Sequence, residues 1–332
     1  MAEGNVFITG AAGYVGRNLL RHFVARGHAV TGLVRSPEAA DRIASWGARP
    51  VLGDMLTAEL APLMSGADRL IHAAANVDHT TGSAAASVNP DGTRRVLEAA
   101  NAAGVEKAIH ISTDSVLQDG RPLRNVDETA PYPDRPAGAY SAGKAEAERV
   151  ARHAAAQGQH VVILRPRMVW GRDDTTALPV LVEAVKSGSF AWISGGGYRS
   201  STLHVANLCH AVDLAFAHGE RGAIYHVTDG PARTFRETVT GLLASRGLEA
   251  GGRSVPRAAL RIIAGIGDGL HRLSGGRLGG PLSYQDYATS AVEITLDTQK
   301  AERELGYSPV ISWEEGLGEL RQKQRFRLFH CA

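Results

Sequence analysis

The chain has few cysteines and lysines, little net charge and no long apolar run. Its two cysteines, Cys209 and Cys331, lie far apart in the 332 residues and lack the spacing of a metal site or a redox pair. A reducing, cytoplasmic environment is therefore expected. The net charge of +2 argues against nucleic acid or an anionic membrane as the main partner. A small-molecule substrate is the expected partner instead.

No stretch of the sequence is long and apolar enough to span a bilayer. The first residues lead straight into a strand, without the basic segment and apolar core of a signal peptide. The most apolar late stretch, Ala258–Leu273, contains Arg261 and Asp268 and is too short to cross a membrane. Two interpretations of the wider segment Ala258–Leu282 stay open: a lid over the substrate, and a peripheral contact with a membrane.

Short apolar runs alternate with helical stretches through the first two thirds of the chain. Continuous apolar runs are typical of parallel strands that are buried on both faces. They predict strands at Asn5–Thr9, Ala29–Val34, Pro50–Leu52, Leu70–Ala74, Lys107–Ser112 and Val161–Arg165. Helices are predicted between them, at Val15–Ala25, Asp91–Ala103 and Tyr140–Gln157. This order predicts an α/β protein with a Rossmann-type doubly wound parallel sheet, helices on both faces, and ligand at the carboxyl ends of the strands.

The alternation of strands and helices loosens after residue 170, where glycine-rich loops separate shorter elements. We expect residues 1–170 to form a ligand-binding Rossmann domain, to which segments near 203–225 and 290–300 return. Residues 171–332 are expected to form mainly a smaller α/β substrate-binding domain.

A glycine-rich turn follows the first predicted strand and precedes a predicted helix. In dinucleotide-binding folds the first glycine permits the tight turn, the second lets the backbone approach the pyrophosphate, and the third allows the helix to pack closely on the strand. The pyrophosphate then meets free N–H groups at the helix N-terminus. The residues expected at the cofactor are Thr9, Gly10, Ala12, Gly13, Tyr14, Val15 and Gly16.

The end of the second predicted strand carries an arginine where NAD-binding proteins carry a carboxylate. An acidic residue about 20 residues beyond the glycine turn holds the ribose hydroxyls of NAD(H), whereas this chain has Arg35 there. A guanidinium pairs instead with the 2′-phosphate of NADP(H). NADP(H) is therefore favoured and NAD(H) is the alternative. Arg17 is a second candidate for the phosphate, and either arginine has the alternative of being a solvated surface charge.

Tyr140 and Lys144 are the strongest candidates for catalysis. Their four-residue spacing places both side chains on one face of a predicted helix. A positive charge beside the phenol lowers its pKa, which makes Tyr140 a proton donor and acceptor usable near neutral pH. Hydroxyl residues stand at the carboxyl end of the strand Lys107–Ser112, where they face the ligand crevice. Thr113, with Ser112 as its rival, completes a Ser/Thr–Tyr–Lys set.

With these residues in place, the chain resembles an extended short-chain dehydrogenase/reductase of the NAD-dependent epimerase/dehydratase superfamily. The resemblance covers most of the chain and is strongest over its first two thirds. The matching motifs are Thr9–Gly16, Asp54, His72–Ala74, Asn89 with Asp91–Thr93, Ser112–Val116, Tyr140 with Lys144, and Arg165-Pro166 with Val169 and Gly171.

The resemblance implies a role for each matching residue. Thr113 would hydrogen-bond the substrate oxygen, Tyr140 would exchange a proton with it, and Lys144 would hold the nicotinamide ribose. The further cofactor contacts that it implies are Asp54, Met55, Ala73, Ala74, Ala75, Pro166 and Val169. Asp54 has an alternative as a turn residue. A homodimer through helices of the nucleotide domain is also implied.

Motifs late in the chain resemble the 3β-hydroxysteroid and sterol dehydrogenase branch of this family. They are His204–Asn207, Tyr225–Gly230 and Lys300–Tyr307. Nucleotide-sugar enzymes usually carry an asparagine near the position of Met168 and an arginine at that of Ser200, and dehydratases carry a glutamate where Ser115 stands. The branch therefore implies a dehydrogenase.

We predict an NAD(P)-dependent oxidoreductase that interconverts a secondary alcohol and a ketone on a mostly apolar, cyclic or steroid-like molecule. Tyr140 is its general acid/base. The candidate substrate contacts are Thr113, Asp114, His79 and Met168, and His79 has the alternative of a structural histidine. A nucleotide-sugar epimerase or dehydratase is the alternative function, and a non-catalytic NADP(H) sensor is a third. No metal site is predicted.

Overall fold

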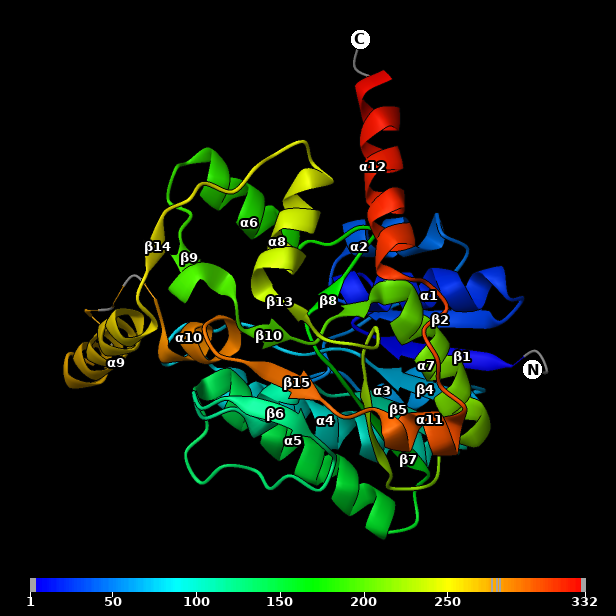
Figure 1. Ribbon diagram of the computed structural model, residues 1–332. Helices are drawn as coiled ribbons and strands as arrows, with labels where there is room; N and C mark the ends of the chain where they lie inside the picture. Colours follow the sequence, from blue (N-terminus) through cyan, green and yellow to red (C-terminus); the bar gives the residue numbers. More distant parts are fainter. Residues whose placement is uncertain (1–3, 276, 279, 281, 330–332) are drawn as a thin grey trace.

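A seven-stranded sheet, parallel throughout, forms the centre of the protein (Figure 1). The computed structural model describes residues 4–275, 277–278, 280 and 282–329. The sheet consists of β1 (Asn5–Thr9), β2 (Ala29–Val34), β3 (Arg49–Leu52), β4 (Arg69–His72), β5 (Lys107–Ile111), β7 (Val161–Pro166) and β12 (Ile224–Val227). Their order, β12-β7-β5-β4-β1-β2-β3, reverses direction beside β1, as in a doubly wound fold.

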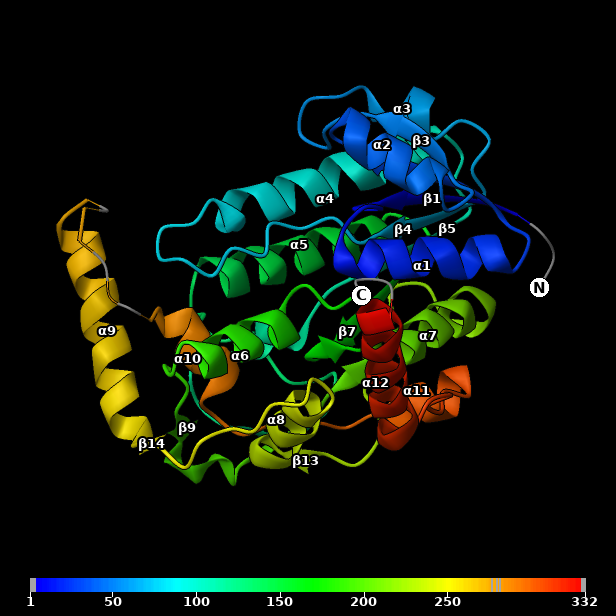
Figure 2. The ribbon, with the colours of Figure 1, turned by 90° about the horizontal axis from the view of Figure 1, so that it is seen from above.

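Helices cover both faces of this sheet (Figure 2). One apolar core lies under α1 (Tyr14–Ala25), α2 (Pro37–Ala44), α7 (Val205–His218) and α11 (Gln299–Leu305). The other lies under α3 (Leu60–Leu63), α4 (Ala85–Ala102) and α5 (Ala139–Ala156). Neighbours along a strand serve opposite cores, as Phe7 and Ile8 do, because side chains alternate across a sheet. The predicted fold class is confirmed.

A second layer of shorter elements lies beside the carboxyl ends of the large sheet. A four-stranded sheet has the order β13 (Arg233–Thr234), β10 (Arg199–Ser200), β15 (Ile294–Leu296), β6 (Leu123–Val126). Two strand pairs join β8 (Val169–Trp170) to β11 (Leu203–His204) and β9 (Trp192–Ile193) to β14 (Ser254–Val255). The helices here are α6 (Ala177–Lys186), α8 (Phe235–Ala244), α9 (Arg257–Leu273), α10 (Tyr284–Ser290) and α12 (Trp313–Phe329), with 3-10 turns at Asp114–Leu117 and Ser194–Gly196.

The boundaries differ from the predicted ones in two places that bear on the site. β4 ends at His72, so Ala73 and Ala74 belong to the following loop. α4 begins at Ala85 and contains Pro90, whereas the prediction began after that proline. A proline inside a helix removes one hydrogen bond, and α4 continues through Pro90 while its start packs closely against Gly143 of α5.

The apolar residues of the second layer mostly form core. Trp170 and Trp192 are fully buried and Tyr198 is nearly so, so none of the three opens onto a cleft. Among the described residues, no helix is long and apolar enough to cross a membrane. Cys331, and residues 276, 279 and 281 of the segment Ala258–Leu282, lie outside the described residues.

Candidate active site

The glycine turn between β1 and α1 is too tightly packed for side chains at two of its three glycines. A Cβ on Gly10, whose φ is +69°, would lie 2.8 Å from the backbone nitrogen of Ala74. A Cβ on Gly16 would lie 2.0 Å from the carbonyl oxygen of Gly10. The turn, the start of α1 and the loop after β4 therefore meet at backbone distance.

Gly13, the middle glycine of the turn, leaves the N-terminus of α1 open. Gly13 is exposed and provides no side-chain cap, and the first turn of α1 carries no acidic residue. The free N–H groups and the positive end of the helix dipole therefore face the space beside the turn without a partner. This arrangement fits the pyrophosphate of a dinucleotide.

Buried polar contacts hold the turn against β4. The Thr9 hydroxyl lies 2.7 Å from Nδ1 of His72 and accepts a hydrogen bond from the backbone N–H of Ala74. Nε2 of His72 lies 3.0 Å from the hydroxyl of Thr93. Burial lowers the pKa of His72 to about 3, so the ring is neutral. This chain of contacts positions the loop Ala73–Ala75, predicted to line the cofactor, directly beside the glycine turn.

The structure places Arg35 and Asp54 together at the ends of β2 and β3. The Arg35 side chain is 82% exposed, and its Nη1 lies 3.9 Å from Oδ2 of Asp54. The guanidinium is therefore free to pair with a phosphate. Arg17, the second candidate, instead donates to the carbonyl oxygen of Asp173. Met55 packs on Gly92 of α4, and its contact with a cofactor stays a prediction.

Tyr140 and Lys144 lie on the first turns of α5, with Lys144 buried and Tyr140 half-buried. Gly143 between them brings α5 against α4, because a Cβ there would lie 2.0 Å from the carbonyl oxygen of Ala85. The Lys144 ammonium donates to the carbonyl oxygen of Ile111, the last residue of β5, at 2.7 Å. The pair is thus fixed at the carboxyl edge of the sheet.

Lys144 was predicted to lower the pKa of Tyr140, and this prediction is wrong in this structure. Burial raises the pKa of Tyr140 to about 12, whereas a hydrogen bond with Thr113 lowers it and the charge of Asp114 raises it. Burial lowers the pKa of Lys144 to about 8, against the opposing effect of Glu148. Removing a phenol from water disfavours its charged form more than these neighbours favour it. Tyr140 is therefore a protonated acid at neutral pH.

The two rival hydroxyls at the end of β5 point to different partners. Ser112 donates to Oε2 of Glu148 at 2.5 Å. The Thr113 hydroxyl lies beside Tyr140, whose pKa it lowers. It donates to Oδ1 of Asp114 at 3.3 Å and accepts from the backbone N–H of Ser115 at 3.2 Å. The geometry therefore favours Thr113 over Ser112 as the hydroxyl that works beside Tyr140.

Glu148 supports this region and was missed by the sequence reasoning. It is fully buried and binds Arg165 through both carboxylate oxygens, with hydrogen bonds from Ser112 and from Tyr132. These contacts lower its pKa despite burial. Its position one helical turn after Lys144 was the available signal, since residues four apart share a helix face. The carboxylate anchors the middle of α5 to β7.

Asp114, predicted to contact substrate, lies in a buried ion pair. Its Oδ2 is 2.8 Å from Nη1 of Arg167 and 2.6 Å from the side-chain nitrogen of Gln118. Arg167 also donates to Ser200, where nucleotide-sugar enzymes carry an arginine. Asp114 is thereby positioned to join β5 to the second layer, and its contact with substrate stays a prediction.

His79 lies beside Tyr140, whereas Met168 packs against the apolar cluster around Trp170. The His79 ring is 4.7 Å from the Tyr140 ring, centre to centre, and its Nδ1 lies 3.1 Å from Asp286 of α10. Met168 follows β7, is half-buried and has a φ of +39°, a strained conformation for a non-glycine residue. Pro166 ends β7 and Val169 begins β8 on either side of it.

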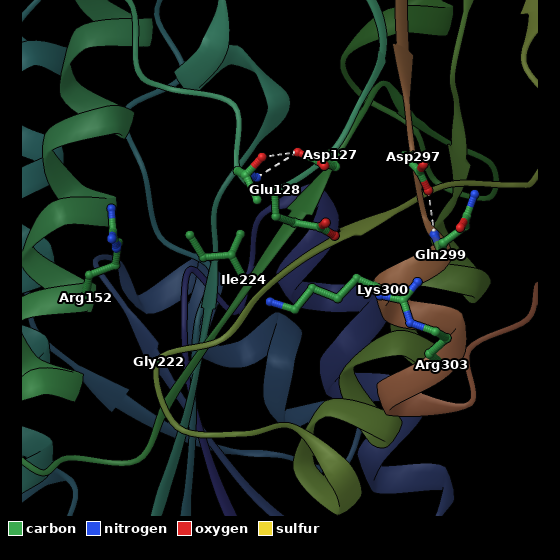
Figure 3. A pocket seen from close by; sticks show the side chains of 10 residues that line it. Asp127, Glu128, Arg152, Gly222, Ile224, Asp297, Gln299, Lys300 and Arg303 are labelled. Atoms are coloured by element: carbon green, nitrogen blue, oxygen red, sulfur yellow. Dashed lines mark hydrogen bonds between the residues drawn. The ribbon is translucent and has the colours of Figure 1, made fainter.

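A cavity of about 410 Å³ lies elsewhere, along the β12 edge of the large sheet (Figure 3). Its charged lining residues are Arg152, Lys300, Arg303, Asp127, Glu128 and Asp297. The three cations and three carboxylates balance, and none of the predicted site residues lines it. Among the described residues, no three His, Cys, Asp or Glu side chains are grouped as metal ligands.

The fold and these motifs match known proteins along nearly the whole chain. The model of the NAD dependent epimerase/dehydratase family matches residues 6–228. A 4-hydroxy-2-methyl-3-oxo-4-farnesyl-3,4-dihydroquinoline-1-oxide ketoreductase from Stigmatella aurantiaca is 42% identical over 318 residues, which is 95% of each chain. A 3β-hydroxysteroid dehydrogenase/Δ5→4-isomerase from Mycobacterium tuberculosis is 31% identical over 95% of this chain and 89% of its own.

Solved structures include a similar enzyme with bound NAD. A dTDP-glucose 4,6-dehydratase from Streptomyces venezuelae, solved with NAD, has 26% sequence identity and a TM-score of 0.75. The superposition covers 96% of each chain. The match to this dehydratase spans both the large sheet and the second layer.

Proposed function

The chain belongs to the NAD-dependent epimerase/dehydratase family, within the extended short-chain dehydrogenases/reductases, and is an oxidoreductase; from this premise we propose that it reduces a ketone to a secondary alcohol on an apolar small molecule. The observation that carries this proposal is the placement of the Thr113 hydroxyl beside Tyr140 at the carboxyl edge of the sheet. Lys144 lies one turn further along α5, and the open glycine turn lies on the same edge.

The chemistry follows from the protonation state of the pair. A bound nicotinamide cofactor supplies the hydride in reduction and accepts it in oxidation. Thr113 and Tyr140 both donate hydrogen bonds to the carbonyl oxygen, where negative charge develops as the carbon is reduced. Tyr140 then gives its proton to that oxygen. The protonated phenol is the acid in reduction, and the phenolate is the base in oxidation. Reduction is proposed as the working direction because the 42% identical relative is a ketoreductase.

We propose NADPH as the preferred cofactor. The exposed guanidinium of Arg35 stands at the end of β2, where the adenosine ribose of a dinucleotide lies in this fold. Asp54, which the family resemblance places near the adenine, is the neighbouring carboxylate and competes for the Arg35 guanidinium. The preference therefore depends on how strongly Arg35 binds the 2′-phosphate relative to Asp54.

An apolar substrate is supported by the relatives and by the second layer. The 42% identical relative is a ketoreductase for a farnesylated quinoline oxide, and a 31% identical one is a hydroxysteroid dehydrogenase. Ser200 is buried against Arg167. A diphosphate needs cationic partners, and Arg199 beside it points to the exposed surface. A cytoplasmic homodimer remains part of this proposal.

A nucleotide-sugar epimerase or dehydratase is the second candidate, favoured by the likeness to the dTDP-glucose dehydratase structure. The two functions differ in cofactor balance, because an epimerase regenerates its cofactor in each cycle. The experiment incubates the protein and NADPH with a steroid ketone or a farnesylated dihydroquinoline-oxide ketone. In parallel, the protein and NAD⁺ or NADP⁺ are incubated with UDP-glucose, because an epimerase or dehydratase first passes a hydride from the sugar to the oxidised cofactor. We expect one NADPH oxidised per alcohol formed from a ketone, and no reaction of UDP-glucose. Conversion of UDP-glucose without net reduction of the cofactor would replace this proposal by the second.

A further inference from the structure

The helix α9 presents a row of large apolar side chains to solvent. Ten large hydrophobic residues are strongly exposed in the described part of the chain, and six of these lie between residues 262 and 278. Within α9 they are Ile262, Ile263, Ile266, Leu270 and Leu273, with exposures between 44% and 89%. Steps of three and four residues place them on one side of a helix. We call these five residues the α9 stripe.

The opposite side of α9 is the one that packs on the protein. Ala264, Gly267 and Asp268 are buried there. A Cβ on Gly267 would lie 2.9 Å from Cα of Gly280, and Asp268 accepts a hydrogen bond from Thr81 at 2.5 Å. The α9 stripe is therefore not a core face, and it does not line a closed substrate pocket.

The charges beside the α9 stripe are positive. Arg261 and Arg272 are exposed and lie three helical turns apart on one flank of the stripe, and Arg277 is exposed just beyond the helix. The only acidic residue of α9 is Asp268, which is buried on the inner side. The balanced net charge of +2 thus conceals a local surface on which apolar and cationic side chains combine.

We propose that α9 docks this protein on the surface of an anionic phospholipid bilayer. A helix with an apolar side and an arginine-bearing flank lies in the headgroup plane, with its apolar side chains among the acyl chains and its cations near the phosphates. In both views α9 lies along the outer edge of the molecule, apart from the helices that cover the large sheet (Figures 1 and 2). Nothing in the described chain covers the stripe.

A short path of contacts connects α9 to the catalytic tyrosine. Thr81 bonds Asp268 on the inner side of α9, and Gly82 packs against the His271 ring. Two residues before Thr81, His79 lies against Tyr140. The loop 79–82 therefore joins the inner face of the docking helix to the site, which would place the site close to the lipid surface from which an apolar substrate enters.

The test is co-sedimentation of the full chain with vesicles. We compare vesicles of equal parts phosphatidylglycerol and phosphatidylcholine with vesicles of phosphatidylcholine alone. The protein should bind the anionic vesicles, and the variant Ile262→Ser/Ile266→Ser/Leu270→Ser should bind at least about tenfold more weakly. Arg261→Gln/Arg272→Gln should lose roughly 10- to 30-fold in affinity for anionic vesicles only. Val180→Ser, an equally exposed valine on α6, is the matched control and should bind normally.

Two further measurements keep the inference separate from folding and from the redox function. NADPH affinity should be unchanged in every variant, because none of these residues lies at the cofactor turn. Light scattering should show the same oligomeric state for the wild type and the triple variant. Absence of vesicle binding by the wild type, equal binding by the triple variant, or a dimer that dissociates in the triple variant would each overturn the docking proposal, and none of them affects the proposed reduction.

Discussion

Replacing Arg35 by serine tests the cofactor preference at one side chain. The guanidinium is 82% exposed and has Asp54 as an ion-pair partner at 3.9 Å, a separation too long for a strong hydrogen bond. It can therefore turn to a phosphate with little loss. The serine variant removes that contact and leaves Asp54 in place.

The expected loss of NADPH affinity follows from the exposure of the Arg35 side chain. A hydrogen bond to a charged group is worth about 1.5–3 kcal/mol, and solvent screening at an exposed site reduces such a contribution to about 1–2 kcal/mol. This corresponds to a roughly 5- to 30-fold loss of NADPH affinity. NADH has no 2′-phosphate, so its affinity should stay the same or rise slightly. The NADPH advantage should also shrink as salt is added.

The assay is titration of both cofactors by fluorescence, with Arg121→Ser as the matched control. Arg121 is 84% exposed and lies 3.6 Å from Asp119, so it has the same exposure and a similar ion pair far from the cofactor turn. The control should leave both affinities unchanged. A change of less than twofold in NADPH affinity for Arg35→Ser would refute the reasoning.

Three further predictions concern the site and its support. Thr113→Val should lower kcat by roughly 10²-fold because it removes a donor to the substrate oxygen. Ser112→Ala should leave kcat within a few-fold of the wild type and lower the free energy of unfolding by about 1 kcal/mol. Steady-state kinetics and denaturant unfolding distinguish the two variants, and equal losses of kcat would contradict the assignment of Thr113. Gly16→Ala should lower the free energy of unfolding by ~1–3 kcal/mol, because its Cβ would lie 2.0 Å from a backbone oxygen of the turn. Gly265→Ala has open space around it and should be neutral or slightly stabilising. Equal denaturant midpoints for the two variants would contradict the close packing at Gly16. Burial holds the pKa of His110 well below its ordinary value, so the unfolded chain takes up a proton near pH 6.5 that the folded chain does not. The free energy of unfolding should therefore fall as pH drops below 6.5, by up to ~1.4 kcal/mol per pH unit for this ring. In His110→Phe, the free energy of unfolding measured with denaturant should depend less steeply on pH.

The sequence predicted the elements whose patterns are local. β1 and β2 have the predicted bounds because continuous apolar runs end at a glycine turn and at a charged residue. The glycine turn could also be predicted, because its glycines stand where the backbone needs a tight turn or a close approach that a side chain would block. The start of α4 could not, because proline normally marks a first helical turn, whereas Pro90 lies inside α4.

The electrostatics of the site could not be read from spacing alone. The four-residue spacing of Tyr140 and Lys144 predicts proximity, but the pKa of each depends on burial, which the fold determines. The choice between Ser112 and Thr113 likewise depends on Glu148, thirty-six residues further along the chain from Ser112. Arg17 was a plausible phosphate contact until the fold brought Asp173 beside it. Each of these outcomes depends on a partner that is distant in sequence.

The most direct test of the account is turnover by Tyr140→Phe, compared with its affinity for NADPH. The substitution removes one hydroxyl and keeps the ring that packs against His79. We predict that NADPH oxidation with a steroid ketone or a dihydroquinoline-oxide ketone falls by about 10²- to 10⁴-fold, while the NADPH dissociation constant changes by less than twofold. Turnover of the variant at the wild-type rate would contradict the assignment of Tyr140 as the proton donor.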